Sequence, residues 1–146
     1  MPLNNDSKEF IALLNSHGVE YLIVGAHSLA FHARPRFTGD LDILIRPTPK
    51  NAAKMVAILN KFGFGDLGAS ASDFTTPGQL IQLGRAPNRI DLLTSITGVD
   101  TGDALATKVP ADLDELPVFF LSKTLLIANK RAVGRPQDLA DLRELQ

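Results

Sequence analysis

The sequence contains no cysteine among its 146 residues. A disulfide framework and a thiolate metal site are therefore both excluded. No stretch is long and apolar enough to predict a membrane span, and residues 1–6 lack the basic start and apolar core of a secretory leader. We therefore expect a protein of the cytoplasm with no membrane partner.

The chain also lacks a strong net charge, which is formally -1 at pH 7. Proteins dedicated to binding nucleic acids usually carry a clearly basic face, so this balance disfavours a long polyanion as partner but leaves room for a local basic pocket. No repeat, low-complexity tract or linker divides the sequence. With 45% hydrophobic and 21% charged residues, the composition predicts one globular domain over residues 1–146.

The spacing of apolar residues predicts alternating helices and strands. We expect helices over 7–17, 26–32, 49–62, 103–108, 122–131 and after Pro136, and strands over 19–24, 36–45, 79–84, 88–93 and 118–121. The helix over 49–62 has Thr48 as its cap and Pro49 as its first residue. The segment 63–78 is rich in glycine and serine and predicts a loop with at most one helical turn. The short spacing between the third and fourth strands predicts an antiparallel hairpin.

Two aspartates mark the strand expected over 36–45. Side chains alternate along a strand, so Asp40 and Asp42 share one face while the aliphatic residues beside them share the other. Two like charges one repeat apart are unfavourable unless a positive charge lies between them, and hard divalent cations with oxygen ligands commonly supply it. We therefore predict that this strand holds Mg²⁺ or Mn²⁺.

A third acid repeats the pattern on the strand over 88–93, where Arg89, Asp91 and Leu93 share a face. If the two strands are neighbours, three carboxylates line one face of the sheet. Two metal ions roughly 3.5 to 4 Å apart could then activate an attacking hydroxyl and neutralise a leaving pyrophosphate, as nucleotidyl transfer requires. Asp91 would hold or deprotonate the incoming hydroxyl. The alternative is that the three acids are unrelated surface residues.

The strand over 19–24 closes on Gly25, and a helix follows. Such a junction exposes free backbone N–H groups at the positive end of a helix, which is a site for phosphate oxygens. Arg34 and Arg36 could contact the same triphosphate. The alternatives are that the glycine only allows a tight turn and that both arginines are ordinary surface residues.

The run Val24-Gly25-Ala26-His27-Ser28, with Asp40-Leu41-Asp42-Ile43 and Ile90-Asp91-Leu92 downstream, resembles the minimal nucleotidyltransferase domains of the DNA polymerase beta superfamily. The resemblance implies an α+β fold with a mixed, largely antiparallel sheet and helices packed on one face. It also implies two acidic metal ligands on one strand, a third on a neighbouring strand, and a glycine turn that contacts the triphosphate.

The glycine turn departs from the family pattern at one position. The family usually has serine or glycine directly after the first glycine, whereas this chain has Ala26. Ala26 still supplies a backbone N–H to a phosphate. Ser28 is the hydroxyl that could replace the missing contact if the turn is longer.

The tail from Lys130 to Asp141 also resembles the ending of small bacterial members of this superfamily. Some of these resemble the transferase component of toxin/antitoxin pairs, in which a helical lysine and a following aspartate assist catalysis. Lys130 and Asp138 are the matching positions, which implies a phosphate contact for Lys130. The alternative for Lys130 is a solvated cation at a helix C-terminus, where the helix dipole favours positive charge.

Two functions follow from these observations. The first is a metal-dependent enzyme that moves a nucleoside monophosphate from a nucleoside triphosphate to an acceptor hydroxyl on a protein, a transfer RNA end or a small molecule, with a partner protein as one place for the acceptor to dock. The second is a catalytically degenerate binding or regulatory protein of the antitoxin type. Ala26 favours the second function, and the intact set of three acids favours the first.

Overall fold

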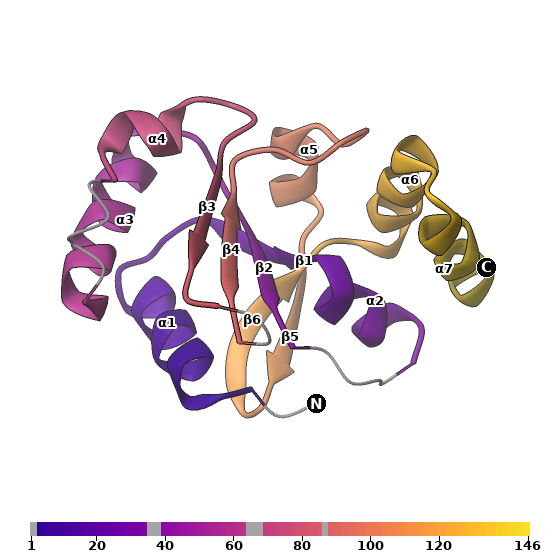
Figure 1. Ribbon diagram of the computed structural model, residues 1–146, viewed down its shortest axis with the longest axis horizontal. Helices are drawn as coiled ribbons and strands as arrows, with labels where there is room; N and C mark the ends of the chain where they lie inside the picture. Colours follow the sequence, from indigo (N-terminus) through magenta and orange to yellow (C-terminus); the bar gives the residue numbers. More distant parts are fainter. Residues whose placement is uncertain (1–2, 35–38, 64–68, 86–87) are drawn as a thin grey trace.

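A computed structural model of the chain describes residues 3–34, 39–63, 69–85 and 88–146. Within these ranges, seven helices surround one six-stranded sheet (Figure 1). The strands are β1 Tyr21–Val24, β2 Leu41–Ile45, β3 Leu80–Leu83, β4 Ile90–Leu93, β5 Val109–Leu113 and β6 Leu116–Phe120, in the order β3-β4-β2-β1-β6-β5.

Three of the strand pairs are antiparallel, namely β1 with β2, β3 with β4, and β5 with β6. The pairs β1 with β6 and β2 with β4 are parallel. The sheet is therefore mixed and largely antiparallel, which confirms the expected fold class. The expected hairpin is the pair β3–β4.

Helices cover both faces of this sheet. On one side lie α1 Asn5–Ser16, α3 Pro49–Phe62 and α4 Ala71–Thr75; on the other lie α2 Gly25–His32, α5 Thr101–Ala106, α6 Lys123–Val133 and α7 Pro136–Leu145 (Figure 1). The sequence predicted helices on one face, and the structure adds a second layer. The reason is that β1 is buried along its whole length, so both of its faces need apolar cover.

The core consists of two clusters separated by the sheet. The first packs Ile23 and Ile43 of the sheet against α1, α3 and α4. The second packs Leu22 and Leu44 against α2, α5, α6 and α7. Full burial of one such aliphatic side chain contributes about 1.5–3 kcal/mol. Adjacent residues of the same strands therefore hold both layers in place.

The helix ends follow local sequence signals. Thr48 accepts a hydrogen bond from the backbone N–H of Asn51, and Gly63 ends α3 with a φ of 92°, so the helix over 49–62 is confirmed. Ser122 likewise accepts from the backbone N–H of Leu125 at the start of α6. The first helix begins two residues earlier than expected, because the side chain of Asn4 caps it.

The strand β5 is absent from the sequence prediction. Pro110 and alternating exposed residues weaken its strand signal, but a proline is tolerated because β5 lies at the edge of the sheet. Its turn into β6 places Asp114 and Glu115 at φ values of 51° and 71°. None of the helices in the described ranges combines the length and apolar character of a membrane span.

Candidate active site

The structure brings the three predicted acids together on one face of the sheet. The parallel strands β2 and β4 pair with Asp42 directly opposite Asp91. Asp40 immediately precedes β2, and its Oδ1 accepts a hydrogen bond of 2.9 Å from the backbone N–H of Arg89. The aliphatic neighbours Leu41 and Ile43 point into the first core cluster. Strand alternation therefore presents Asp42 and Asp91 on the opposite face. The strand expected over 36–45 begins only at Leu41, so Asp40 joins the other two acids from the bend before β2, through Arg89.

Asp42 carries the strongest electrostatic signature of the three. Burial raises the pKa of its carboxyl from 3.8 to about 7, with further increases from the neighbouring Asp91 and Asp40. The cation of Arg89 opposes this increase in the pKa of Asp42. The cluster therefore holds more negative charge than its present surroundings compensate.

Arg89 supplies the positive charge at this cluster. Its Nε lies 2.6 Å from Asp91 Oδ1, and its Nη2 lies 3.1 Å from Asp91 Oδ2 and 3.5 Å from Asp40 Oδ2. As the described side chains lie, no group of three histidine or acidic residues is arranged to hold a metal ion. The three carboxylates nevertheless fit Mg²⁺ or Mn²⁺ in their hard oxygen donors and their surplus negative charge. For all three to share a metal, the guanidinium of Arg89 must move from between Asp40 and Asp91.

Gly25 lies directly against this acidic cluster. Its φ is +67°, and a Cβ atom placed on it would lie 2.2 Å from Asp42 Oδ2. Both the backbone conformation and the close approach therefore require glycine. The helix α2 starts at Gly25, and Val24 before it makes no side-chain cap. The first N–H groups of α2 are thus left without a side-chain cap beside Asp42.

The residues after Gly25 differ in their exposure. Ala26 is partly exposed, so its backbone lies near the surface of the turn. Ser28 is fully buried, and its Oγ has no hydrogen-bond partner in the part of the chain that the structure describes. The Oγ of Ser28 is thus a buried polar group without a partner among the described residues, and its contact with a triphosphate stays a prediction.

His27 connects α2 to the first acid. Its ring lies close enough to the backbone of Asp40 to affect its pKa, while its buried Nδ1 has no partner among the described residues. Burial lowers the pKa of His27 from 6.5, and the backbone of Asp40 opposes this shift only in part. The imidazole is therefore favoured in its neutral form beside the backbone of Asp40.

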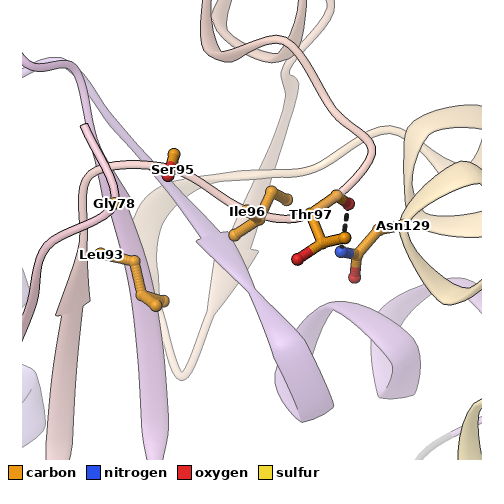
Figure 2. A pocket seen from close by; sticks show the side chains of 6 residues that line it. All are labelled: Gly78, Leu93, Ser95, Ile96, Thr97 and Asn129. Atoms are coloured by element: carbon orange, nitrogen blue, oxygen red, sulfur yellow. Dashed lines mark hydrogen bonds between the residues drawn. The ribbon is translucent and has the colours of Figure 1, made fainter. Parts of the chain in front are cut away.

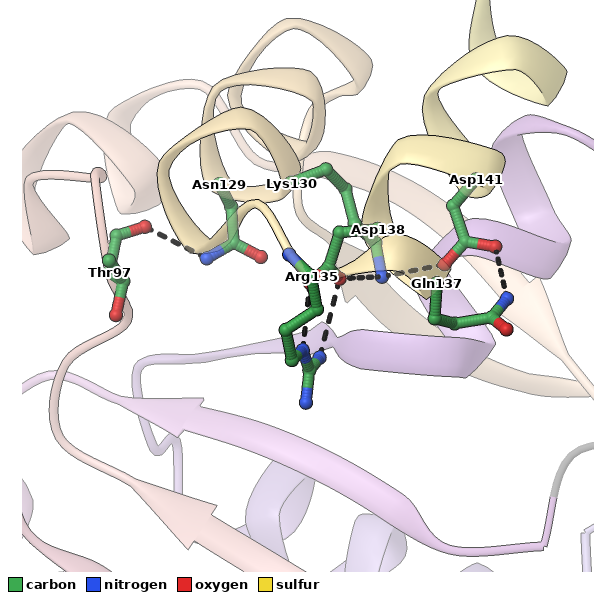
Figure 3. Close-up of polar contacts among 7 residues, drawn as sticks. All are labelled: Thr97, Asn129, Lys130, Arg135, Gln137, Asp138 and Asp141. Carbon is green, nitrogen blue, oxygen red and sulfur yellow. Dashed lines mark hydrogen bonds and ion pairs between the residues drawn. The ribbon is translucent and has the colours of Figure 1, made fainter.

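Lys130 lies in a different group of charges, between α6 and α7 (Figure 3). Its Nζ lies 3.3 Å from Asp138 Oδ1 and 3.0 Å from Asp141 Oδ2. Arg135 also binds Asp138, through Nε at 2.8 Å, and Gln137 donates to Asp141 at 2.9 Å. We call these five residues the α6–α7 polar cluster. The structure thus pairs Lys130 with Asp138, the two positions that the resemblance singled out, and joins them to each other rather than to the three acids.

The two predicted arginines have different outcomes. Arg34 is exposed and forms an ion pair of 3.2 Å with Glu144 of α7. Arg36, predicted as a triphosphate contact, lies outside the described residues.

Two residues of the site were missed by the sequence prediction. Arg89 was seen to share a face with Asp91, and that alternation was the signal that it would reach the carboxylate. His27 carried no such signal, because its contact with Asp40 joins residues from two separate elements.

Comparisons with known proteins show which fold this chain shares. No family model matches the chain, and no curated protein matches it. Among solved structures, the chain is similar to the lincosamide antibiotic adenylyltransferase LnuA in its lincomycin-bound crystal structure. The TM-score is 0.59 and the identity 12%, over 99% of this chain and 96% of that chain. The chain has the nucleotidyltransferase fold. At 12% identity the likeness shows the fold alone.

Proposed function

We propose that this protein is a nucleotidyltransferase, which moves a nucleoside monophosphate from a nucleoside triphosphate to an acceptor hydroxyl. The observation that supports this most directly is the pairing of Asp42 with Asp91 across neighbouring strands, beside a glycine turn that only a residue without Cβ can form. The chain also shares its fold with an adenylyltransferase, which is consistent with this class of reaction, although fold alone does not determine function.

In this proposal Asp40, Asp42 and Asp91 hold Mg²⁺ or Mn²⁺, which when bound acts as a Lewis acid and neutralises phosphate charge. Asp42 faces the turn at Gly25, so it orients the triphosphate end of the site. Asp91 is the buried acid, and it holds or deprotonates the acceptor hydroxyl. The backbone N–H of Arg89 keeps Asp40 in position.

The triphosphate lies in this proposal at the N-terminus of α2. The backbone N–H groups of Gly25 and Ala26 have no side-chain cap there, and an anion is favoured at the positive end of a helix. Arg36 remains a predicted phosphate contact. Lys130 is not assigned to the phosphates, because two buried aspartates already bind it.

The acceptor in this proposal carries a hydroxyl. LnuA is a lincosamide antibiotic adenylyltransferase, which offers a small molecule as one acceptor. A protein side chain and a transfer RNA end are the other two. A toxin/antitoxin setting with a partner protein stays part of the proposal through the resemblance of the tail.

Calorimetry with ATP, GTP, CTP and UTP, each with and without Mg²⁺, tests the proposal. We expect metal-dependent binding of at least one triphosphate, lost in the double variant Asp40→Asn with Asp42→Asn. The matched control is Asp112→Asn with Glu115→Gln, which removes two exposed acids on the β5–β6 hairpin. Incubation of labelled triphosphates with a lysate of the native host then identifies the acceptor from the label that it acquires.

A regulatory protein of the antitoxin type is the second candidate function. Ala26 in the turn favours it, as do the ion pairs of Arg89 with Asp91 and Asp40, which engage two of the three proposed metal ligands. Triphosphate binding that is indifferent to Mg²⁺, and that survives the double aspartate variant, would contradict the enzyme and support this candidate.

A further inference from the structure

A pocket of about 430 Å³ opens at the end of β4. It is lined by Gly78, Leu93, Ser95, Ile96, Thr97 and Asn129. Figure 2 shows Gly78 and Leu93 at one end of the pocket and Asn129, on α6, bonded to Thr97 at the other. We call this the β4 pocket. Its volume lies within the range of small-molecule sites, which is roughly 300–1,000 Å³.

The β4 pocket shares a sheet face with the acids. Leu93 lies two residues beyond Asp91 on β4, so both side chains point to the same side, about 7 Å apart along the strand. The turn at Gly25 lies beside Asp42, on the other side of this acid pair. The uncapped start of α2, the pair Asp42 and Asp91, and the β4 pocket thus follow one another along this face of the sheet.

This order matches the order of groups in a nucleoside triphosphate. If the triphosphate tail lies at Gly25 and the α-phosphate at Asp42 and Asp91, the ribose and base must extend away from the helix end. Leu93 and the segment after it lie in that direction. The acceptor hydroxyl, in contrast, must lie beside Asp91 itself to reach the α-phosphate.

The chemistry of the β4 pocket fits a flat heterocycle. Leu93 and Ile96 offer apolar surface, and Asn129 offers an amide edge. Asn129 Nδ2 donates to the backbone oxygen of Thr97 at 2.8 Å, which fixes the plane of the amide. Within the described part of the chain, Oδ1 and the second N–H of this amide make no hydrogen bond. An amide that keeps one free acceptor and one free donor can pair with the edge of a nucleobase.

We propose that the β4 pocket binds the base of the nucleoside triphosphate and that Asn129 reads its edge, an inference that rests on the proposed function. Leu93 and Ile96 pack against the faces of the base. Asn129 sits next to Lys130 of the α6–α7 polar cluster, so the rigid pairing of α6 with α7 also holds the base-reading amide in place.

The test compares ligands that share a triphosphate tail, four of which carry a nucleoside and one of which does not. Calorimetry in Mg²⁺ measures the binding of each of the four nucleoside triphosphates and of inorganic tripolyphosphate, to the wild-type chain and to Asn129→Ala. We expect the wild type to bind one nucleoside triphosphate more tightly than tripolyphosphate. In Asn129→Ala that affinity should fall about tenfold, while the affinity for tripolyphosphate stays unchanged.

Two controls separate this effect from misfolding. Asn60→Ala removes an exposed asparagine on α3, on the other side of the sheet, and should change neither affinity. Asn129→Ser keeps a small polar side chain but loses the amide edge, so it should behave like Asn129→Ala. Thermal melts of all three variants establish that the fold is intact.

The outcomes distinguish the two proposals. Equal affinities for the nucleoside triphosphates and tripolyphosphate, unchanged in Asn129→Ala, would overturn the base pocket and leave the proposed function standing. Binding of neither ligand in Mg²⁺ would overturn both. A tenfold loss that is the same for tripolyphosphate and for the nucleoside triphosphates would assign Asn129 to the phosphates and also overturn the base pocket.

Discussion

Gly25 is required for two separate reasons, namely its backbone conformation and the lack of space for a side chain. A positive φ costs an L-residue roughly 1–2 kcal/mol, and a Cβ would also collide with the Asp42 carboxylate. Gly63, at the end of α3, has a φ of +92° but nothing within 4 Å of its missing Cβ. Substitution of Gly63 therefore carries only the cost of the backbone conformation, whereas substitution of Gly25 adds the cost of steric crowding against Asp42.

We expect Gly63→Ala to lower the free energy of unfolding by about 1 kcal/mol and to leave triphosphate binding unchanged. Gly25→Ala should lower this free energy further and abolish metal-dependent binding, because the Cβ displaces Asp42. Urea denaturation and calorimetry measure the two effects. Equal losses of stability in both variants, with binding retained, would contradict the close approach.

The negative charge of Asp42 lowers the stability of the metal-free protein. Its pKa is raised from 3.8 to about 7, so folding disfavours the ionised form, and the group destabilises the metal-free protein increasingly as the pH rises from about 4 to about 7. Asp42→Asn removes this ionisation. The variant should be more stable than the wild type by up to about 4 kcal/mol at pH 8 and nearly equal to it at pH 4.

Urea denaturation in a chelator at both pH values checks this prediction. The variant should at the same time lose metal-dependent triphosphate binding. A variant that is less stable than the wild type at pH 8 would show that the carboxylate is compensated in the folded state.

At the scale of the elements, the α6–α7 polar cluster joins two helices through buried charges. Asp138 and Asp141 have 1% and 3% of their surface exposed, and Lys130 is bound to both. Arg135 binds Asp138 from the surface, with 70% of its side chain exposed. Removal of one partner from a buried pair costs about 3–5 kcal/mol, whereas a surface ion pair contributes about 0–1 kcal/mol.

We therefore expect Lys130→Met to destabilise the chain by about 3 kcal/mol and Arg135→Met by less than about 1 kcal/mol. Chemical denaturation of the two variants measures the difference. Lys130→Met with full stability but lost triphosphate binding would instead return Lys130 to the phosphate site, as the resemblance implied.

The same cluster predicts a loss of stability in acid. Arg135 and Lys130 lower the pKa of Asp138 from 3.8 to about 2, so the ionised form stabilises the fold at neutral pH. This contribution is complete above about pH 4 and is lost as the pH falls from about 4 to about 2. Denaturation of the wild type and of Asp138→Asn across this range checks it: the wild type should lose its advantage over the variant as the pH falls.

At the scale of the whole molecule, the two core clusters share the strands of one sheet. Tyr21 belongs to the first cluster and Leu126 to the second. Loss of one cluster would disrupt the strands against which the other cluster packs, so we expect one cooperative unfolding transition. Near-ultraviolet circular dichroism of Tyr21, the single tyrosine, and far-ultraviolet circular dichroism of the helices should report the same midpoint.

A core variant tests this coupling directly. Leu126→Ala should lower the free energy of unfolding by about 2–5 kcal/mol and move the Tyr21 signal on the opposite face by the same amount. The control Leu139→Ala, at a side chain that is 51% exposed, should have little effect. A Tyr21 transition that is insensitive to Leu126→Ala would mean that the two layers unfold separately.

Much of the local structure could be predicted from the sequence, because its causes are local. Thr48 with Pro49 determines where α3 begins, and Ser122 does the same for α6. Alternation along the strand placed Asp40 and Asp42 on one face. The edge strand β5 was missed because Pro110 lowers its intrinsic strand preference, whereas its position beside β6 depends on residues outside the segment.

The sequence by itself determined which acids could share a face and which glycine could form the turn, because backbone geometry repeats every two residues in a strand and a positive φ favours one residue type. Only the tertiary structure decided that β2 and β4 are neighbours with Asp42 opposite Asp91, that Gly25 touches that carboxylate, and that Lys130 is bound between two helices. These contacts join segments far apart in the chain. Their register depends on the packing of two whole cores, which no local pattern contains.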